Sequence, residues 1–389
     1  MLRITFPYIM LISLTALAGG ILNTFERFLV PALTPVLLNL SLISAALLLS
    51  GHLEVPVTAL AWGVLAAGFA QLLLQIPALM RLGLMPRPRW GWRHSGVRRI
   101  MKLMIPTLFG SSVAQVNLLI DSIIATFLVT GSVSWLYYSD RLLEFPLGVF
   151  GIALATVILP NLSQKHAKAS TAEFSATLDW ALRLAVIITV PAAVGLIILA
   201  EPILITLFQY DAFQPDDVRL SAYSLVAYSA GLPAFIAVKV LAPGYYARQD
   251  TKTPVKIAIV AMVSNMLLNL LFVGLLLNRG FEGPHAGLAL ASSAAAYLNA
   301  ILLFRGLKSR EVYQPERGWL RLGIAVTIAC TAMGGLLLFM TNDTESWFRA
   351  EALLRVKNLG LTIGFGVLVY VFTSMVFGLK THDLLRGSK

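Results

Sequence analysis

The chain has 389 residues, of which 58% are hydrophobic and only 13% are charged, and its mean hydropathy is +0.79. This composition excludes a soluble globular domain, in which about a quarter of the residues are charged, and it indicates an integral membrane protein. The formal net charge of +11 does not indicate a nucleic-acid partner, because the basic residues are spread over many loops instead of gathering on one face.

Apolar runs of about 20 residues, the length needed to cross a bilayer, recur along the whole chain. Eleven such runs are present, at 4–22, 31–50, 56–80, 103–129, 133–163, 179–207, 218–244, 254–278, 284–304, 319–340 and 356–379. The connections between them are short, so a functional site has to be formed between helices. The sequence therefore predicts an all-α polytopic membrane protein with about eleven transmembrane helices.

Most of the 30 Lys and Arg residues lie in connections on one side of the predicted bundle. This side carries Arg27, the segment 81–102, Lys165, Arg248, the segment 305–321 and Arg386. By the positive-inside rule the richer side is cytoplasmic, which places the C-terminus in the cytoplasm and the first residue outside. Arg3 and Ala16-Leu17-Ala18 imitate a signal peptide, but Pro7 and this charge distribution favour a transmembrane helix.

An internal repeat relates residues 12–50 to residues 233–273. Each copy has an apolar helix, an aromatic residue followed two residues later by Arg, and a Pro that opens a second helix containing Asn. The matching pieces are Phe25-Glu26-Arg27, Pro31 and Asn39 in one copy, and Tyr246-Ala247-Arg248, Pro254 and Asn265 in the other. Because the two copies lie six spans apart, they predict two six-helix lobes in parallel repeat. Three helices of the first lobe would then precede residue 1.

The repeat also predicts the domain boundaries. Residues 1–81 would be the three remaining helices of the first lobe, 82–102 a basic interlobe linker, 103–305 the six-helix second lobe, and 306–389 a terminal helix pair with a tail. The linker contains Trp90 and Trp92 among its arginines, which is typical of a segment at the membrane interface. A role in gathering an anionic substrate is the alternative.

A lone carboxylate, Asp121, lies in the middle of the 103–129 span, and Asn265 and Asn269 present one polar face of the 254–278 helix. If these helices meet, their oxygens could bind Na⁺, or Asp121 could exchange a proton, which would couple the protein to an ion gradient. Ordinary hydrogen bonding between helices is the alternative. No metal-binding cluster and no other cofactor is expected, since the single cysteine, Cys330, lies within a span.

Three charges interrupt the 133–163 span, which we expect to be a single helix capped by Ser132. Arg141 lies about eight residues into it, or roughly 12 Å below the membrane surface, with Asp140 and Glu144 beside it. Ionisable groups at this depth are costly and usually face a polar cavity or a partner. The sequence therefore predicts either a pathway for a charged substrate or a structural ion pair between helices.

The connection ARQDTKTP, residues 247–254, links two predicted spans on the basic side. Arg248, Asp250 and Lys252 predict a cytoplasmic gate or tether, and Pro254 fits the first turn of the next helix. Lys239, in the preceding helix, is interpreted as a side chain that extends toward the interface.

The strings ITFPYIMLISLTALAGGILNTFERF (4–28), SVSWLYYSDRLLEFPLGVFGIALATVILPNLS (132–163) and VLAPGYYARQDTKTPVKIA (240–258) closely resemble the MurJ (MviN) family. Members of this family are lipid II flippases of bacterial cell-wall synthesis, in the superfamily that includes multidrug antiporters and O-antigen flippases. The resemblance implies a MATE-like fold of two lobes plus two extra C-terminal helices, with the start of the first lobe missing here. It also implies an inner-membrane protein that moves lipid II to the external leaflet by alternating access.

Lipid II is a polyprenyl pyrophosphate with a bulky polar head, so the resemblance implies a wet, cationic binding site. Arg141 matches the family motif and is the expected pyrophosphate contact, because a guanidinium donates bidentate hydrogen bonds and stays charged. Glu144 would hold the guanidinium when substrate is absent, and Asp140 would join that network. Ser132 and Ser134 offer hydroxyls to sugar or phosphate. Membrane lipids and the cell-wall synthesis machinery are the other implied partners.

Two other functions remain open on the sequence alone. One is the export of drugs or of another polyprenyl-linked saccharide by a member of the same superfamily. The other is a membrane glycosyltransferase or phosphatase, which would need a carboxylate or histidine cluster at one membrane face. The five histidines are scattered, so enzymatic activity is not expected. No GxxxxGK[ST] segment is present, so ATP-driven transport by this chain is not expected either.

Overall fold

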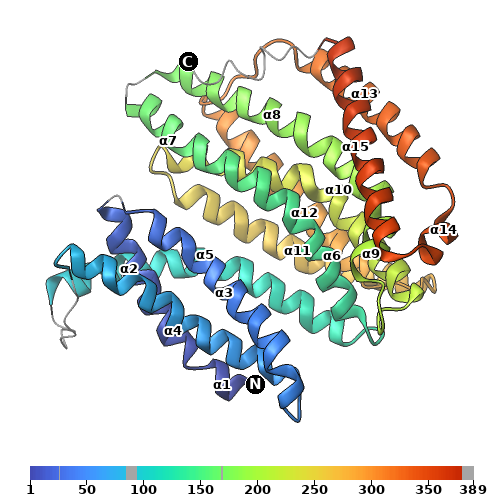
Figure 1. Cartoon of the computed structure of the whole chain (residues 1–389). Helices are drawn as coiled ribbons and strands as arrows, with labels where there is room; N and C mark the ends of the chain where they lie inside the picture. The colour runs from blue at the N-terminus through green and yellow to red at the C-terminus, as the bar shows by residue number, and fades with distance from the viewer. Residues whose placement is uncertain (26, 85–93, 168–169, 379–389) are drawn as a thin grey trace. The chain divides into compact units, whose positions relative to one another are not determined.

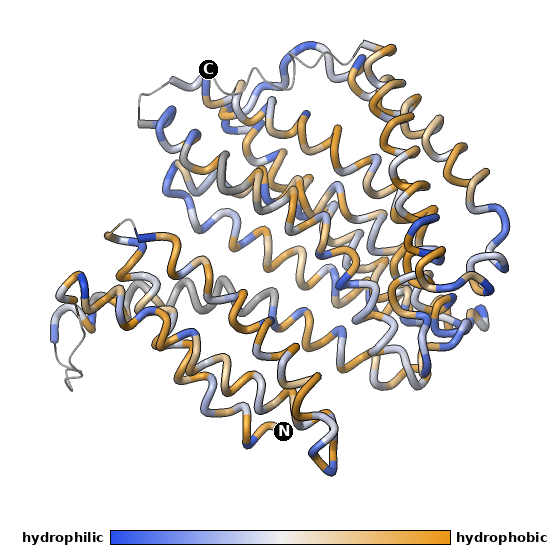
Figure 2. Tube along the Cα trace, viewed as in Figure 1, coloured by the Kyte–Doolittle hydropathy of each residue, from blue (hydrophilic) through white to orange (hydrophobic). Residues whose placement is uncertain are grey.

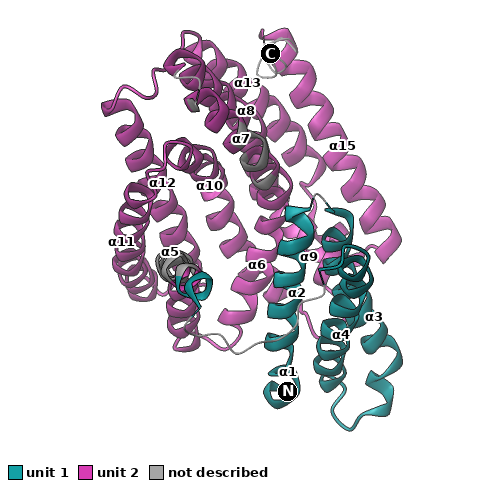
Figure 3. Cartoon of the chain, turned by 90° about the vertical axis from the view of Figure 1, so that its left-hand side faces the viewer, with its two compact units in different colours: residues 1–99 teal, residues 100–389 magenta. Residues whose placement is uncertain are grey.

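The computed structural model describes residues 1–25, 27–84, 94–167 and 170–378. In these ranges the chain is helical and contains no strand (Figure 1), which confirms the predicted all-α fold. Glu26 of the proposed repeat, residues 85–93 of the predicted linker and the tail 379–389 lie outside the described residues. The contacts divide the chain into two compact units, Met1–Arg99 and Ile100–Lys389 (Figure 3).

The first unit contains α1 (Leu2–Thr5), α2 (Tyr8–Thr24), α3 (Leu29–Leu48), the short 3₁₀ helix η1 (Ser50–His52), α4 (Thr58–Arg81) and the first residues of α5. The second unit contains the rest of α5 (Ser95–Thr126), α6 (Ser132–Pro146), the π-helical segment η2 (Leu147–Ile152), α7 (Ala153–Ala167), α8 (Thr171–Ile198), α9 (Ala200–Phe208), α10 (Pro215–Tyr246), α11 (Lys252–Asn278), α12 (Ala286–Ser309), α13 (Trp319–Met340), α14 (Thr344–Arg349) and α15 (Ala352–Val376).

Among the described residues, nine helical stretches are long and apolar enough to cross a membrane. They are α1 together with α2, and α3, α4, α8, α10, α11, α12, α13 and α15. The other two predicted spans, 103–129 and 133–163, correspond to α5 and to the stretch α6–η2–α7. Figure 2 shows hydrophobic residues along the helices and hydrophilic residues concentrated near their ends, as a bilayer requires.

Two local expectations were wrong. Ser132 does not cap its helix; the cap is Gly131, whose φ of 104° lies in the left-handed region that glycine adopts without strain. The run 179–207 is not one helix, because α8 starts earlier, at Thr171, and the chain leaves helical geometry at Leu199 before α9 begins. Hydropathy does not detect either feature, since Leu199 is as apolar as its neighbours.

The first unit is held together by α2, α3 and α4. Ala18, Leu22 and Leu79 form its small apolar core. Two glutamines of α4 connect the helices: the Gln71 side-chain amide donates to the Thr34 carbonyl at 2.8 Å and the Gln75 amide to the Thr15 carbonyl at 3.2 Å. Amide side chains of this kind are common hydrogen-bonding contacts between membrane helices.

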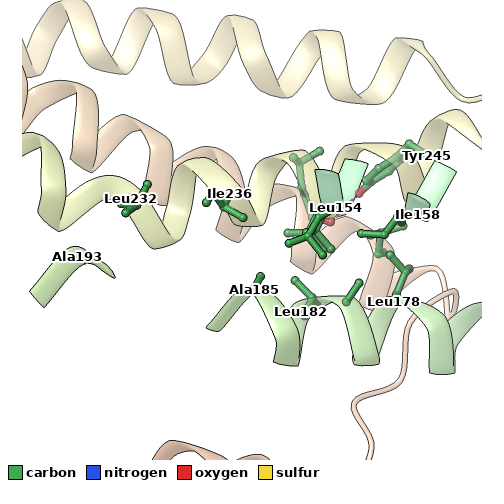
Figure 4. Packing of buried hydrophobic residues seen from close by; sticks show 14 of the residues in the cluster. Leu154, Ile158, Leu178, Leu182, Ala185, Ala193, Leu232, Ile236 and Tyr245 are labelled. Carbon is green, nitrogen blue, oxygen red and sulfur yellow. Dashed lines mark hydrogen bonds between the residues drawn. The ribbon is translucent and has the colours of Figure 1, made fainter. Parts of the chain in front are cut away.

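The second unit is organised around α10, which packs against α6, α7, α8, α9 and α12. Its inward residues, among them Leu232, Ile236 and Tyr245, meet Leu178 and Leu182 of α8 in the main hydrophobic core (Figure 4). At the far end of the unit, α13 and α15 pack against each other, and α13 also packs on α8. The helices α13 and α15 therefore pack directly on the rest of the second unit.

Helices α11 and α12 approach closely where Gly287 lies against the backbone of α11. A Cβ atom at Gly287 would lie 2.9 Å from the backbone nitrogen of Val273 and 3.1 Å from the carbonyl carbon of Phe272. Backbone atoms cannot turn aside as a flexible side chain can, so the two helices would have to separate. At Gly274, by contrast, an added Cβ meets nothing within 4 Å.

Gly287→Ala should therefore destabilise the protein by about 1–3 kcal/mol, the usual cost of overpacking a well-packed contact. Gly274→Ala is the matched control and should leave the unfolding midpoint unchanged or raise it, because alanine is preferred over glycine within a helix by about 0.5–1 kcal/mol. Thermal unfolding of the two purified variants measures the difference. Equal midpoints for both variants would contradict the close approach of α11 and α12.

Candidate functional site

One side of α6 is fixed to α10 by side chains near its start. The Trp135 indole nitrogen donates to the Asp217 carboxylate at 2.8 Å, and the Ser139 hydroxyl donates to the Ser221 carbonyl at 2.7 Å. Leu143 continues this buried side one turn further on. Because these residues recur at helical spacing, the opposite side of α6 is left uncovered by α10.

The uncovered side of α6 carries the predicted charges. Ser134, Tyr137, Arg141 and Glu144 follow each other at three or four residues, so they form one stripe, and all four are exposed. Arg141 pairs with Glu144, each side chain being 51% exposed, and the guanidinium lies 4.9 Å from the centre of the Tyr137 ring. The expected ion pair is thus present, and it is open on one side.

The other two α6 candidates differ from this stripe. Ser132 is buried and its hydroxyl donates to the Val129 carbonyl at 2.7 Å, so that hydroxyl is already used within the protein. Asp140 is half-buried and forms no hydrogen bond or ion pair with any described residue, including its neighbours Arg141 and Glu144. Ser134, Arg141 and Glu144 therefore share the exposed side of α6, whereas Ser132 lies on its buried side.

The predicted meeting of Asp121 with Asn265 and Asn269 occurs between α5 and α11. The Asn269 side-chain amide donates to one Asp121 carboxylate oxygen at 2.6 Å and to the Asn265 amide oxygen at 3.0 Å. The sequence analysis missed two further members, Asn117 of α5 and Ser292 of α12, which donate to the other carboxylate oxygen at 3.3 and 3.4 Å. We call these five residues the carboxylate cluster.

The carboxylate cluster has the composition of a cation site. Asp121, Asn265 and Asn269 are all buried, and the amide oxygens of Asn117 and Asn269 are buried without a hydrogen-bond donor. Carboxylate, amide and hydroxyl oxygens are the ligands that hard cations prefer. Buried polar atoms normally have a partner, so we expect these two amide oxygens to bind a ligand.

The predicted gate loop is tied to the end of α12. Asp250 accepts hydrogen bonds from the Thr253 backbone nitrogen at 3.0 Å and hydroxyl at 2.7 Å, and Arg310 donates to its carboxylate at 2.6 Å. These hydrogen bonds, first of all that from the Thr253 hydroxyl, together with the Arg310 charge, lower the pKa of Asp250 to about 2. Lys252 and Pro254 lie in the first turn of α11, Lys252 exposed and Pro254 buried.

Lys239 lies beside the π-helical segment η2. Its side chain would be 3.0 Å from a Cβ atom placed on Gly151, and it has no hydrogen-bond or ion-pair partner among the described residues. π-helical segments inside helices are frequent at functional sites. Lys239 is therefore a candidate contact for an anionic ligand. The sequence analysis interpreted it only as a side chain that extends toward the membrane interface.

Together these observations define the class of protein. The chain has the features of a polytopic membrane transporter: nine helical stretches of its described residues are long and apolar enough to cross a bilayer. In addition, α6 carries an open ion pair, and a buried carboxylate cluster lies between α5, α11 and α12. No group of three or more His, Cys, Asp or Glu residues that could hold a metal ion is present in the described part of the chain.

Comparison with known proteins identifies the family. The profile of the lipid II flippase MurJ family matches residues 1–357, and the chain belongs to this family. It is 48% identical to the probable lipid II flippase MurJ of Vibrio cholerae over 389 residues, covering 100% of this chain and 73% of the relative. It is 43% identical to the lipid II flippase MurJ of Burkholderia cenocepacia, covering 100% of this chain and 75% of the relative.

The fold agrees with the sequence match. A solved structure of a lipid II flippase MurJ in an inward closed conformation superposes with a TM-score of 0.75 at 26% identity, covering 96% of this chain and 73% of that one. The family is one of flippases and not of enzymes, so the glycosyltransferase and phosphatase alternatives are set aside. Family membership and the nine apolar helices of the described residues make this chain a multi-pass protein of the bacterial inner membrane.

The hydrogen bonds of Asp250 predict a pH dependence of the gate loop. A carboxylate with a pKa near 2 in the folded protein, against about 3.9 in an unfolded chain, stabilises the fold above pH 4 and loses this effect as the pH falls toward 2. The unfolding midpoint of the wild type should exceed that of Asp250→Asn by a constant amount from pH 7 to 5. This difference should disappear as the pH falls from about 4 to 2. Asp216→Asn, at a highly exposed position, is the control and should show no such gap.

Proposed function

We propose that this chain moves lipid II from the cytoplasmic to the external leaflet of the inner membrane by alternating access. The observation that carries the proposal is the exposed ion pair of Arg141 and Glu144 inside a predicted membrane span. An exposed charge pair at this depth is unfavourable against acyl chains and requires water or a polar ligand. The stripe of Ser134, Tyr137, Arg141 and Glu144 would then line the path of the polar head.

The chemistry of the stripe suits a diphosphate. A guanidinium has five N–H donors in a planar fork, and Arg141 uses only part of this fork on Glu144. A diphosphate can replace Glu144 as the acceptor, because its oxygens match the same bidentate geometry. Glu144 would hold Arg141 in place between substrates, and Lys239 would offer a second cation further along the helix pair α10 and η2.

The topology proposed for this cycle follows from the basic loops. The connections α7–α8, α10–α11 and α12–α13, each with five flanking helix residues on either side, carry ten Lys and Arg residues, whereas α5–α6, α9–α10 and α11–α12 counted in the same way carry two. This difference favours a cytoplasmic location for the first three connections and for the C-terminus. Membrane lipids would surround the apolar faces. The cell-wall synthesis machinery, which would use lipid II on the external side, is the proposed partner.

We further propose that the carboxylate cluster couples transport to a cation gradient. Asp121, Asn265, Asn269 and Ser292 would supply oxygen ligands to Na⁺, and the two amide oxygens without donors favour this assignment. A bound cation would neutralise the buried carboxylate and hold α5 against α11 and α12. Proton exchange at Asp121 is the alternative form of coupling.

The role of Arg141 can be tested by expressing the chain in a strain depleted of its own lipid II flippase. The wild-type chain should support growth, and Arg141→Ala should lower lipid II movement at least about tenfold, since a hydrogen bond to a charged group contributes about 1.5–3 kcal/mol. Arg141→Lys should be intermediate, because an ammonium does not donate in a fork. Arg219→Ala, which removes another exposed, ion-paired arginine, is the matched control. Full growth with Arg141→Ala would exclude this residue as the substrate contact.

The coupling proposal predicts that Na⁺ stabilises the purified protein. A ligand that binds only the folded state raises its stability as its concentration passes the dissociation constant. The unfolding midpoint of wild type should therefore rise with NaCl more than with choline chloride, and this difference should vanish in Asp121→Asn. Asp343→Asn, which alters a carboxylate at the start of α14, should behave as wild type. An identical Na⁺ response in Asp121→Asn would contradict the assignment.

A further inference from the structure

A cavity of about 450 Å³ lies in the second unit at the end where the basic loops meet. It is lined by His166 of α7, by Ser170, Thr171 and Phe174 at the start of α8, by Arg248 of the gate loop, and by Arg310, Glu311 and Val312 after α12. The cavity contains none of the α6 stripe or carboxylate cluster residues. It is therefore a separate site, and the argument for it does not depend on the proposed flippase activity.

Arg248 is the strongest recognition element of this cavity. Its side chain is exposed and has no hydrogen-bond or ion-pair partner among the described residues. The neighbouring Arg310 is different, because Asp250 accepts from its guanidinium and the Tyr245 ring lies 5.9 Å from it. Arg248 therefore offers a whole guanidinium fork, the group that best matches a phosphate oxygen pair.

The start of α8 adds uncharged donors to the same cavity. Ser170 precedes this 28-residue helix, and no side chain caps its first turn. The first backbone N–H groups of a helix have no partner within it and carry partial positive charge, so they favour an anion. The Ser170 and Thr171 hydroxyls also lack hydrogen-bond partners among the described residues, and Glu173 in the same turn makes no capping hydrogen bond.

The carboxylates near the cavity limit the charge of the anion it can take. Asp250 neutralises Arg310, and Glu311, which lines the cavity, forms no ion pair with any described residue. Arg248, the start of α8 and the His166 ring are left to face the ligand. A single negative charge fits this arrangement, whereas a diphosphate or a phosphate monoester would bring its additional charge toward Glu311. Glu311 in turn can accept a hydrogen bond from a hydroxyl or ammonium group of the ligand.

We infer that this cavity binds the phosphate group of a monoanionic phosphodiester that also carries a hydroxyl or ammonium group, as a glycerophospholipid headgroup or its water-soluble deacylated form does. The phosphate lies between Arg248 and the first turn of α8. The polar group on the other side of the ester lies at Glu311, and Phe174 and Val312 contact the carbon atoms of the ligand.

The test is the binding of glycerophosphoethanolamine to the purified full chain in detergent that contains no phospholipid. Binding is measured as the rise in unfolding midpoint with ligand concentration. Wild type should show saturable binding, and Arg248→Ala should weaken it about tenfold or more, as expected for the loss of a charge-assisted hydrogen bond. Glu311→Gln should reduce the preference for glycerophosphoethanolamine over pyrophosphate. Lys308→Ala is the matched control, because it removes an exposed cation close in sequence that does not line the cavity.

The same titration in phosphatidylethanolamine nanodiscs identifies the source of the ligand. Loss of the soluble ligand's binding there means that a membrane lipid already occupies the cavity, and unchanged binding means that the natural ligand is soluble; both results support the site. The inference is overturned if the diester does not bind in detergent, if Arg248→Ala binds it as wild type does, or if pyrophosphate binds more tightly than the diester.

Discussion

The second unit depends on the contact between α10 and α12. Within a bilayer, apolar side chains gain little by leaving lipid for protein, so helices associate through close packing and hydrogen bonds. Here the Ser293 hydroxyl of α12 donates to the Ala227 carbonyl of α10 at 2.7 Å, and the Tyr245 hydroxyl of α10 donates to the Leu303 carbonyl of α12 at 2.8 Å. These bonds fix α10, and α10 in turn fixes α6 through Trp135 and Ser139.

The polar groups of this chain fall into two kinds according to how completely they are partnered. Asp179 of α8 accepts from Tyr313, Trp319 and Arg183 at 2.6–2.7 Å, and it ties the connection before α13 to the second unit. Buried Arg355 of α15 donates to four backbone carbonyls near the ends of α9 and α14. Groups partnered as extensively as these stabilise the fold and offer little to a ligand. The open side of Arg141, the amide oxygens of Asn117 and Asn269 that lack a donor, and Arg248, which has no partner among the described residues, are among the exceptions.

The sequence predicted the helices well because hydropathy and length follow directly from the thickness of the bilayer. It also predicted that Asp121 could meet Asn265 and Asn269, since buried polar side chains in lipid seek one another. It could not identify Ser292 as a member of this cluster, because serine is common in membrane helices and its partner lies 171 residues away. The break at Leu199 and the structural role of Asp179 likewise arise from contacts between distant segments, which local patterns do not encode.

The order of the elements explains how an ion site could act on a substrate site. Asp121 lies near the end of α5, and a connection of only five residues, 127–131, joins α5 to α6. A cation at the carboxylate cluster would change how firmly α5 is held to α11 and α12, and this short connection would pass a movement of α5 to the start of α6. There Gly131 provides the left-handed turn and Trp135 the contact with α10. Coupling requires only that α5 prefers different positions when the carboxylate cluster is ion-bound and when it is ion-free. Arg141 lies two turns into α6 and would move together with that helix.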